Sequence, residues 1–253
     1  MQWRRAWGLL PLALLLLAWE LAVQAKIYPT ILLPPPGKVL MVFVDDWEVV
    51  LSNAVASIGR VAVGITLSFL FAVPLGLMIG RYRLLDTMTD WSIQIFRSIP
   101  PIALIPLALL FLGIGDKPAI ALIFLAGTWP LLINTIFGVR NIERTLIKVA
   151  RAARASEFLV MKDIILPAAL PAIFTGLRLA VGGGWLTVVT AEMIAVKSGL
   201  GYMILNAQLT FRSDLIIAGI IVIGAIGLLA DQAVRRVRAH VCRWQEGLTA
   251  SPE

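Results

Sequence analysis

The chain of 253 residues has very few of the side chains on which metal and redox sites depend. Its one cysteine, Cys242, excludes an internal disulfide framework, and its one histidine, His240, excludes a histidine-based metal cluster. It offers no paired-carboxylate, Ser/His or Cys/His arrangement of the kind that supports catalysis. We therefore expect no metal, no cofactor and no enzymatic activity in this chain.

Two further shortages indicate where the chain resides. It lacks the G-x-x-x-x-G-K-[ST] phosphate loop, so we do not expect it to bind ATP through such a loop. Charged residues make up only 15% of the sequence, whereas 59% of the residues are hydrophobic. This composition is too apolar for a soluble domain of the same size, and it predicts an integral membrane protein.

The apolar residues gather in stretches that are long enough to cross a bilayer, which takes about 20 residues per helix. Six such stretches lie at about residues 6–25, 57–80, 97–115, 118–138, 169–196 and 214–234. The predicted fold is therefore an all-α membrane protein with six transmembrane helices. We expect a single transmembrane domain over residues 1–253, with its core at 53–236.

Six spans leave both termini on one side, and the basic residues indicate which side. Fifteen lysines and arginines fall on the side that holds the termini and five on the other, which predicts cytoplasmic termini. The first span also has features of a cleavable signal peptide, with Arg4 and Arg5 before a leucine run. Trp3, Trp7 and Trp19 favour the alternative of a retained helix anchored at the interface.

A basic segment at residues 140–167 separates the fourth and fifth apolar stretches. At helical spacing, Leu146, Val149 and Ala153 share one face and Lys148 and its basic neighbours another, which predicts a surface helix. A turn near Ser156 and a second short helix follow, and Pro167 is expected to end that helix. From composition alone, the segment is equally consistent with a basic loop that contacts only lipid headgroups.

The end of this segment, Ile164-Ile165-Leu166-Pro167, resembles the cytoplasmic EAA loop of ATP-binding-cassette importer permeases. The resemblance implies a coupling helix that docks on an ATPase subunit. The start departs from the pattern, because Lys148 replaces its glutamate and Arg154 its glycine. A glycine there would supply a turn at positive φ, so either the turn differs or the helix runs on. The residues expected to couple to the ATPase are Arg144, Lys148, Val149, Ala150, Arg151, Ala153, Arg154, Ser156, Glu157 and Phe158.

Three features of the apolar stretches are candidates for a translocation pathway. Pro100, Pro101 and Pro106 predict a broken helix beside a pathway, with a simple kink as the alternative. Gly182-Gly183-Gly184, followed by Thr187, marks either close packing or a hinge. Glu192 is an acid within a span, which is equally consistent with a gate or pathway role and with a snorkelled or hydrogen-bonded structural role. The residues expected along the pathway are Pro100, Pro101, Gly183, Thr187 and Glu192.

The stretches Arg97 to Pro106 and Ser198 to Met203 resemble more narrowly the nitrate, sulfonate and taurine branch of these permeases. The resemblance implies a type I importer permease in the bacterial inner membrane that works by alternating access. Its implied partners are a second permease subunit, two ATPase subunits and an extracytoplasmic solute-binding protein. The implied substrate is taurine, another alkanesulfonate or nitrate, with bicarbonate or a heterocyclic vitamin precursor as alternatives. A channel or membrane scaffold that is not driven by ATP is the alternative from a different class.

Overall fold

The computed structural model describes the backbone of residues 2–243 and the side chains of residues 10–243 except Leu12, Arg144 and Arg151. Its regular elements are helices throughout this part of the chain. The first half comprises α1 (Gln2–Gln24), α2 (Pro36–Asp45), α3 (Trp47–Arg81), α4 (Arg83–Arg97), the 3₁₀ turn η1 (Pro101–Leu104), α5 (Ile105–Leu112) and α6 (Asp116–Arg140). The second half comprises α7 (Arg144–Ala152), α8 (Glu157–Val160), the π-helical stretch η2 (Met161–Ile165), α9 (Leu166–Ala195), α10 (Leu200–Leu209) and α11 (Ser213–Val241).

The long apolar helices agree with the predicted all-α membrane fold. Four helical runs are long and apolar enough to cross a membrane: α3, α6, α11 and the continuous run Glu157–Ala195 that ends in α9. A fifth is a bent pair in which α4 and the η1–α5 unit meet at 80°. The sixth expected span, residues 6–25, corresponds to the 23-residue helix α1, of which the fully described stretch Ala13–Gln24 is apolar. The described residues thus contain four or five of the six expected spans.

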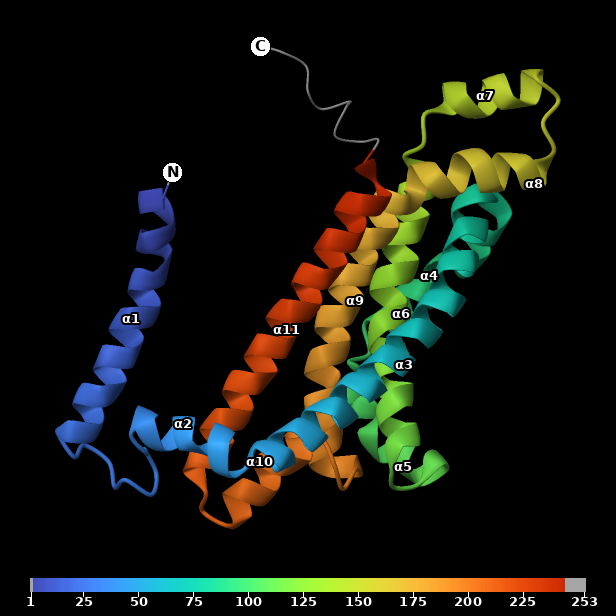
Figure 1. Ribbon diagram of the computed structural model, residues 1–253. Coiled ribbons are helices and arrows are strands. Elements are labelled where there is room, and N and C mark those ends of the chain that lie inside the picture. Colours follow the sequence, from blue (N-terminus) through green and yellow to red (C-terminus); the bar gives the residue numbers. More distant parts are fainter. Residues whose placement is uncertain (1, 244–253) are drawn as a thin grey trace.

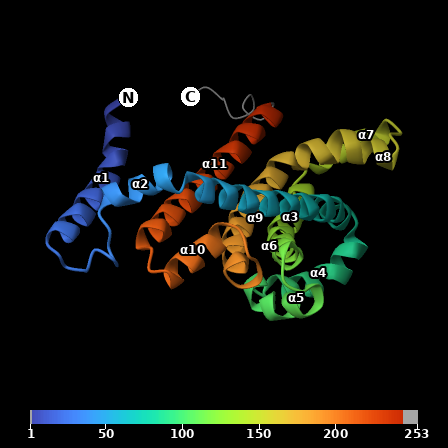
Figure 2. The ribbon, with the colours of Figure 1, turned by 60° about the horizontal axis from the view of Figure 1, so that its bottom comes forward.

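The two ends of the molecule carry different elements (Figure 1). The beginning of α1, the end of α11 and the pair α7–α8 lie at one end, which we call the α7 end. The short helices α2, α5 and α10 lie at the opposite end, which we call the α10 end and which faces the viewer in Figure 2. Two short helices at the α10 end connect long neighbours, since α2 joins α1 to α3 and α10 joins α9 to α11.

The core of the bundle is the sandwich of α3, α6 and α9. Helices cannot be driven together by the hydrophobic effect inside lipid, so they approach closely where small residues allow it. A Cβ atom on Gly64 of α3 would lie 2.6 Å from the Ile123 side chain of α6. Similarly, a Cβ on Gly176 of α9 would lie 3.0 Å from the Pro130 carbonyl oxygen of α6. Glycine is therefore required at both contacts.

The structure corrects two boundaries that the sequence predicted. Pro167 does not end the helix after the basic segment, because the chain runs from Glu157 to Ala195 as one helical stretch. Pro167 instead lies in the first turn of α9, where a missing amide proton is tolerated, and the π-helical η2 precedes it. The third apolar stretch does not begin at residue 97, because Arg97 is the last residue of α4.

Candidate functional site

The bend between α4 and α5 confirms the predicted broken helix. Pro100 and Pro101 lie just after the end of α4 at Arg97, and the residue before a proline is disfavoured in helical conformation. The backbone at Pro100 is extended, with φ −66° and ψ 129°, and Pro101 then opens η1 at a position where its missing N–H costs nothing. The proline pair therefore separates two helical pieces that the apolar pattern alone would join.

This bend forms one wall of a hollow of about 600 Å³, which we call the broken-span groove. Its lining residues come from the bend, α6 and α9: Arg97, Ser98, Ile99, Pro100, Pro101, Ala126, Trp129, Pro130, Ile133, Asn134, Leu179, Gly183 and Thr187. Four of the five residues that we expected along a pathway thus lie together on one groove. Glu192 is the exception and does not line it.

The broken-span groove is apolar with a few polar groups, which suits a small polar solute. The Ser98, Asn134 and Thr187 side chains are among its uncharged polar groups, and each donates a hydrogen bond to a backbone carbonyl oxygen four residues earlier in the chain. The indole of Trp129 stacks on Phe96, with 6.2 Å between the ring centroids. Of the described residues that line this groove, Arg97 alone is charged.

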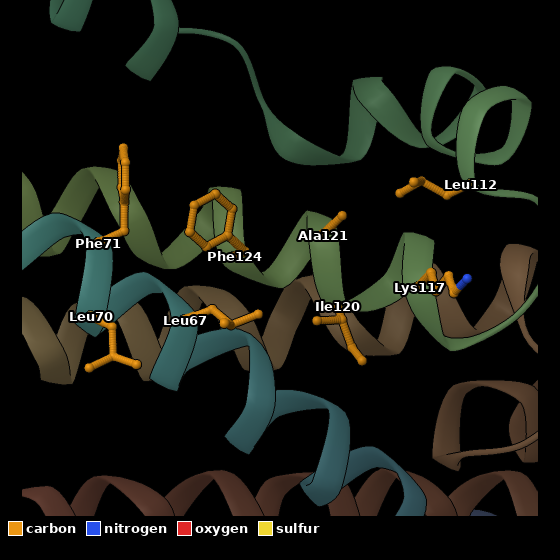
Figure 3. A pocket seen from close by; sticks show the side chains of 8 residues that line it. All are labelled: Leu67, Leu70, Phe71, Leu112, Lys117, Ile120, Ala121 and Phe124. Atoms are coloured by element: carbon orange, nitrogen blue, oxygen red, sulfur yellow. The ribbon is translucent and has the colours of Figure 1, made fainter.

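A second, larger hollow of about 700 Å³ has a different composition. Figure 3 shows its side chains, which come from α3, α5 and α6 and are almost entirely hydrocarbon. Lys117, at one edge, is the one charged residue among the described residues that line it. A hollow of this kind on a membrane-spanning surface suits lipid chains and offers almost no partner to a polar solute.

Glu192 belongs to a buried ion pair at the α10 end of the bundle. Its carboxylate accepts hydrogen bonds from Arg60 Nη1 at 2.6 Å and from Ser57 Oγ at 2.9 Å. Glu192 is fully buried and Arg60 is only 6% exposed. Arg60 also donates to Asp116 Oδ1 at 2.8 Å and to the Ser198 carbonyl oxygen at 2.9 Å. The Arg60 guanidinium thus joins four elements: α3, α6, α9 and the loop before α10. We call the residues Ser57, Arg60, Asp116, Glu192 and Ser198 together the Arg60 cluster.

The loop after α9 completes the Arg60 cluster with backbone amides. Gly199 N–H donates to Asn53 Oδ1 at 2.7 Å, and Gly201 N–H donates to Glu192 Oε2 at 3.0 Å. Gly199 has φ +103°, and a Cβ atom there would lie 2.2 Å from the Glu192 carboxyl carbon. Only glycine fits this position. Both oxygens of the Glu192 carboxylate thus accept hydrogen bonds, as the structural alternative for this acid requires, and the gate role stays a prediction.

The turn after α7 settles how Arg154 replaces the expected glycine. Arg154 adopts φ +56°, so the positive-φ turn is kept and the helix does not run on. Ala153 N–H bonds to Val149 O and Ala155 N–H bonds to Ala150 O, each at 3.0 Å, which is the usual way to satisfy the last carbonyls of a helix. Ser156 then caps α8 by accepting a hydrogen bond from Leu159 N–H at 3.3 Å. The helix-turn-helix prediction is therefore confirmed.

The expected coupling residues are mostly exposed at the α7 end. Val149 is 63% exposed and Phe158 76% exposed, whereas Ala150 packs into the core. Lys148, Ala153 and Ser156 are exposed as well. The side chains of Arg144 and Arg151 lie outside the described residues. Glu157 accepts two hydrogen bonds of 2.9 Å from Arg81 Nη2 at the end of α3.

Three arginines of these sites were not singled out by the sequence analysis. Arg60 lies inside the predicted span 57–80, where a charge predicts a partner, and Glu192 was the obvious acid to pair with it. Arg97 was counted among the basic residues at the side of the termini, whereas the structure places it on the broken-span groove. Nothing in the sequence around Arg81 predicts its partner, because its pairing with Glu157 depends on the tertiary fold.

Comparisons with known proteins define the class of this helical membrane protein. Residues 72–241 match the family described as the binding-protein-dependent transport system inner membrane component. The chain belongs to this family, and it is therefore a permease subunit of an ATP-binding-cassette importer in the inner membrane. Permeases of this family work with ATPase and solute-binding partners.

Relatives and solved structures agree with this assignment. The chain is 33% identical over 244 residues to the taurine transport system permease protein of Escherichia coli, covering 92% of this chain and 87% of that protein. It is 40% identical over 193 residues to the bicarbonate transport system permease protein of Synechococcus elongatus, covering 76% and 69%. Its fold is similar to a chain of the MetNI methionine ABC transporter, with a TM-score of 0.68 at 19% identity, covering 77% of this chain and 96% of that one.

Proposed function

We propose that this permease imports a small solute with a compact anionic group by alternating access. It works as a homodimer with two cytoplasmic ATPase subunits, which hydrolyse the ATP, and an extracytoplasmic solute-binding protein. The α7 end faces the cytoplasm, so both termini are cytoplasmic. Support for the substrate class comes from the relatives, since taurine carries a sulfonate and bicarbonate a carboxylate-like group.

The observation that carries the proposed mechanism is the continuity between the exposed helix pair and the core. The helical run that begins at Glu157, directly after the exposed turn, continues as α9 past the broken-span groove. The Arg81–Glu157 ion pair ties the same point to α3. A displacement of α7 and α8 by a closing ATPase therefore acts on two of the three core helices at once.

The docking face is defined by apolar side chains that the permease itself leaves uncovered. Leu146 is 49%, Val149 63% and Phe158 76% exposed. Charge pairs at an exposed rim contribute little, about 0 to 1 kcal/mol each. We therefore place the main docking contact on these apolar residues and assign Lys148 a smaller role.

A pair of variants tests the docking face. Val149→Asp should release the ATPase from the purified complex or abolish substrate-stimulated ATP hydrolysis, because it buries a charge in an apolar contact. Lys148→Ala, one residue earlier on the basic face, should keep the complex and change mainly its sensitivity to salt. A complex with Val149→Asp that stays intact and fully coupled would show that this face does not dock.

Uptake into proteoliposomes tests the substrate class. The complex, purified with its ATPase subunits and supplied with its binding protein, is assayed with labelled taurine, nitrate and bicarbonate. We expect ATP-dependent accumulation of at least one of them. Flux that is insensitive to ATP would support a channel instead, and the absence of ATP-dependent uptake for all three would remove the small-anion proposal.

Cysteine labelling tests the orientation. The natural Cys242 is a poor reporter, because it is only 5% exposed and burial raises the pKa of its thiol. In a Cys242→Ser background, cysteines at the exposed Lys38 and Lys197 should react with an impermeant reagent in intact cells. A cysteine at Lys148 should react only after permeabilisation. The reverse pattern would invert the topology.

A further inference from the structure

Arg97 lies at the junction of two hollows along the inner surface of the bundle. On one side is the broken-span groove, and on the other is a hollow of about 390 Å³ lined by Asp86, Asp90, Ile93, Gln94, Arg97, Ile133, Ile136, Phe137 and Arg140. Ile133 borders both hollows as Arg97 does. Ile133 precedes Arg140, the last residue of α6, by seven residues, which is about 10 Å along the helix axis at 1.5 Å per residue. Arg97 is therefore level with the interior of the bundle and not with its end.

Arg97 also differs from three arginines of the long helices, Arg60, Arg140 and Arg178, in having no carboxylate partner among the described side chains. Arg60, Arg140 and Arg178 each form an ion pair with an acid on another helix. Among the side chains that the structure describes, no hydrogen bond or ion pair reaches the Arg97 guanidinium. The acids of the adjoining hollow are engaged elsewhere, since Asp86 pairs with Arg140 and Asp90 accepts from the Gln94 amide.

An exposed, unpaired arginine at this depth is costly in a bilayer unless it faces water, an ion or another chain. Its surroundings select among these possibilities. The broken-span groove has Arg97 as its single charge among the described lining residues, which also include Ser98 and Trp129. A guanidinium presents five N–H donors in a planar fork that matches planar or tetrahedral oxyanions, which an ammonium does not.

We propose that the Arg97 guanidinium is the anion-binding group of the translocation pathway, where it holds the sulfonate, nitrate or bicarbonate group of the solute in the broken-span groove. This assignment rests on the small-anion import proposed above. It places the specificity-determining charge at the break between α4 and α5. The Arg60–Glu192 pair at the α10 end has no part in it.

The local potential at Ser98 tests the assignment without knowledge of the substrate. In the Cys242→Ser background, Ser98→Cys in the assembled complex is modified with the anionic sulfonatoethyl methanethiosulfonate and the cationic trimethylammonioethyl methanethiosulfonate. The ratio of the two rates reports the sign of the nearby charge. Because the two reagents respond in opposite directions to a charge within several ångströms, Arg97→Gln should lower the anion-to-cation ratio by about 10-fold or more.

Two further variants separate the guanidinium from general effects. Arg97→Lys keeps the charge and should keep the ratio within about 3-fold, although a point charge binds an oxyanion less well. Arg83→Gln removes an exposed arginine from the other end of the same helix and should leave the ratio unchanged. If Arg97→Gln leaves the ratio unchanged, the side chain extends to the headgroups and the assignment is wrong.

Protection and uptake complete the test. Taurine, nitrate or bicarbonate, whichever the wild-type complex transports, should slow the anionic modification of Ser98→Cys, and Arg97→Gln should abolish this protection. Uptake by Arg97→Gln should fall at least about 10-fold, the loss expected when a charged hydrogen-bonding partner is removed. Uptake of an anion that is unaffected by Arg97→Gln would overturn this assignment alone. Absence of uptake of all three by the wild-type complex would instead overturn the small-anion proposal.

Discussion

Arg60 and Arg97 carry the same charge on membrane-spanning helices, and their surroundings are opposite. Arg60 is 6% exposed and bonds to Glu192, Asp116 and Ser198, so its donors are used within the chain. Arg97 is exposed on a groove and has no partner among the described side chains. A charge within a span therefore does not by itself indicate a pathway, because a fully bonded ion pair stabilises the fold. The charge that the fold leaves unused is the one available to a solute.

The largest effect that this comparison predicts is on stability. Arg60→Met should lower the free energy of unfolding by about 3 to 5 kcal/mol, because it leaves the Glu192 carboxylate buried without its counter-charge. Arg97→Met should change it by less than about 1 kcal/mol, since surface substitutions are usually small. Thermal unfolding of the purified chain, followed by size-exclusion chromatography, measures both.

A double variant sharpens the same test. Arg60→Met with Glu192→Leu removes both charges and should be more stable than Arg60→Met alone, because no unpaired ion remains. A stable Arg60→Met variant that has lost transport would contradict the structural role and would make Glu192 a pathway residue after all.

Two glycines offer a second contrast, of intermediate size. Gly199→Ala should destabilise the chain by about 1 to 3 kcal/mol, because the residue has positive φ and its Cβ atom would overlap the Glu192 carboxylate. Gly182→Ala meets nothing within 4 Å and should be neutral or stabilise the helix by up to about 1 kcal/mol. The unfolding temperatures of the two variants, each compared with that of the wild-type chain, measure this difference in stability. Equal losses would mean that the Arg60 cluster does not hold the loop in the conformation described.

The smallest expected effect concerns the turn at Arg154. Arg154→Gly should relieve the strain of a positive φ and stabilise the turn by up to about 1 kcal/mol, with coupling retained. Arg154→Pro fixes φ near −65° and should disrupt the turn and weaken ATPase binding. The affinity of the ATPase for the two variant complexes measures this. Weaker binding by Arg154→Gly would show that the arginine side chain itself contacts the ATPase.

Much of this arrangement follows from local sequence. The hydrophobic runs predicted α3, α6, α9 and α11, the proline pair predicted the break after Arg97, and the charge pattern predicted the helix pair at 140–160. These features depend on periodicity and backbone chemistry within about 20 residues, which a single sequence displays. The residues expected along a pathway were predicted individually, and the structure places Pro100, Pro101, Gly183 and Thr187 on one groove, while their role in transport stays a prediction.

What local sequence did not provide are pairings between distant elements. Arg60 and Glu192 are 132 residues apart, and Arg81 and Glu157 are 76 apart, so only the packing of α3 on α6 and α9 brings them together. The continuity of the helix through Pro167 was also missed, because a proline signals a stop unless it falls in a first turn. The role of Glu192 stayed open for the same reason, since burial and partners decide it.

The central claim is that the solute passes along the broken-span groove while the Arg60 cluster remains closed. Its most direct test compares Gly183→Cys, which has room for a side chain on the groove, with Ser57→Cys inside the Arg60 cluster. Both are made in the Cys242→Ser background and treated with a small water-soluble thiol reagent while the assembled complex turns over ATP. We expect Gly183→Cys to react at least about 10 times faster than Ser57→Cys, because modification requires exposure of the thiolate. Reaction of Ser57→Cys that appears only during turnover would show that the Arg60 cluster opens as a gate and would contradict this account.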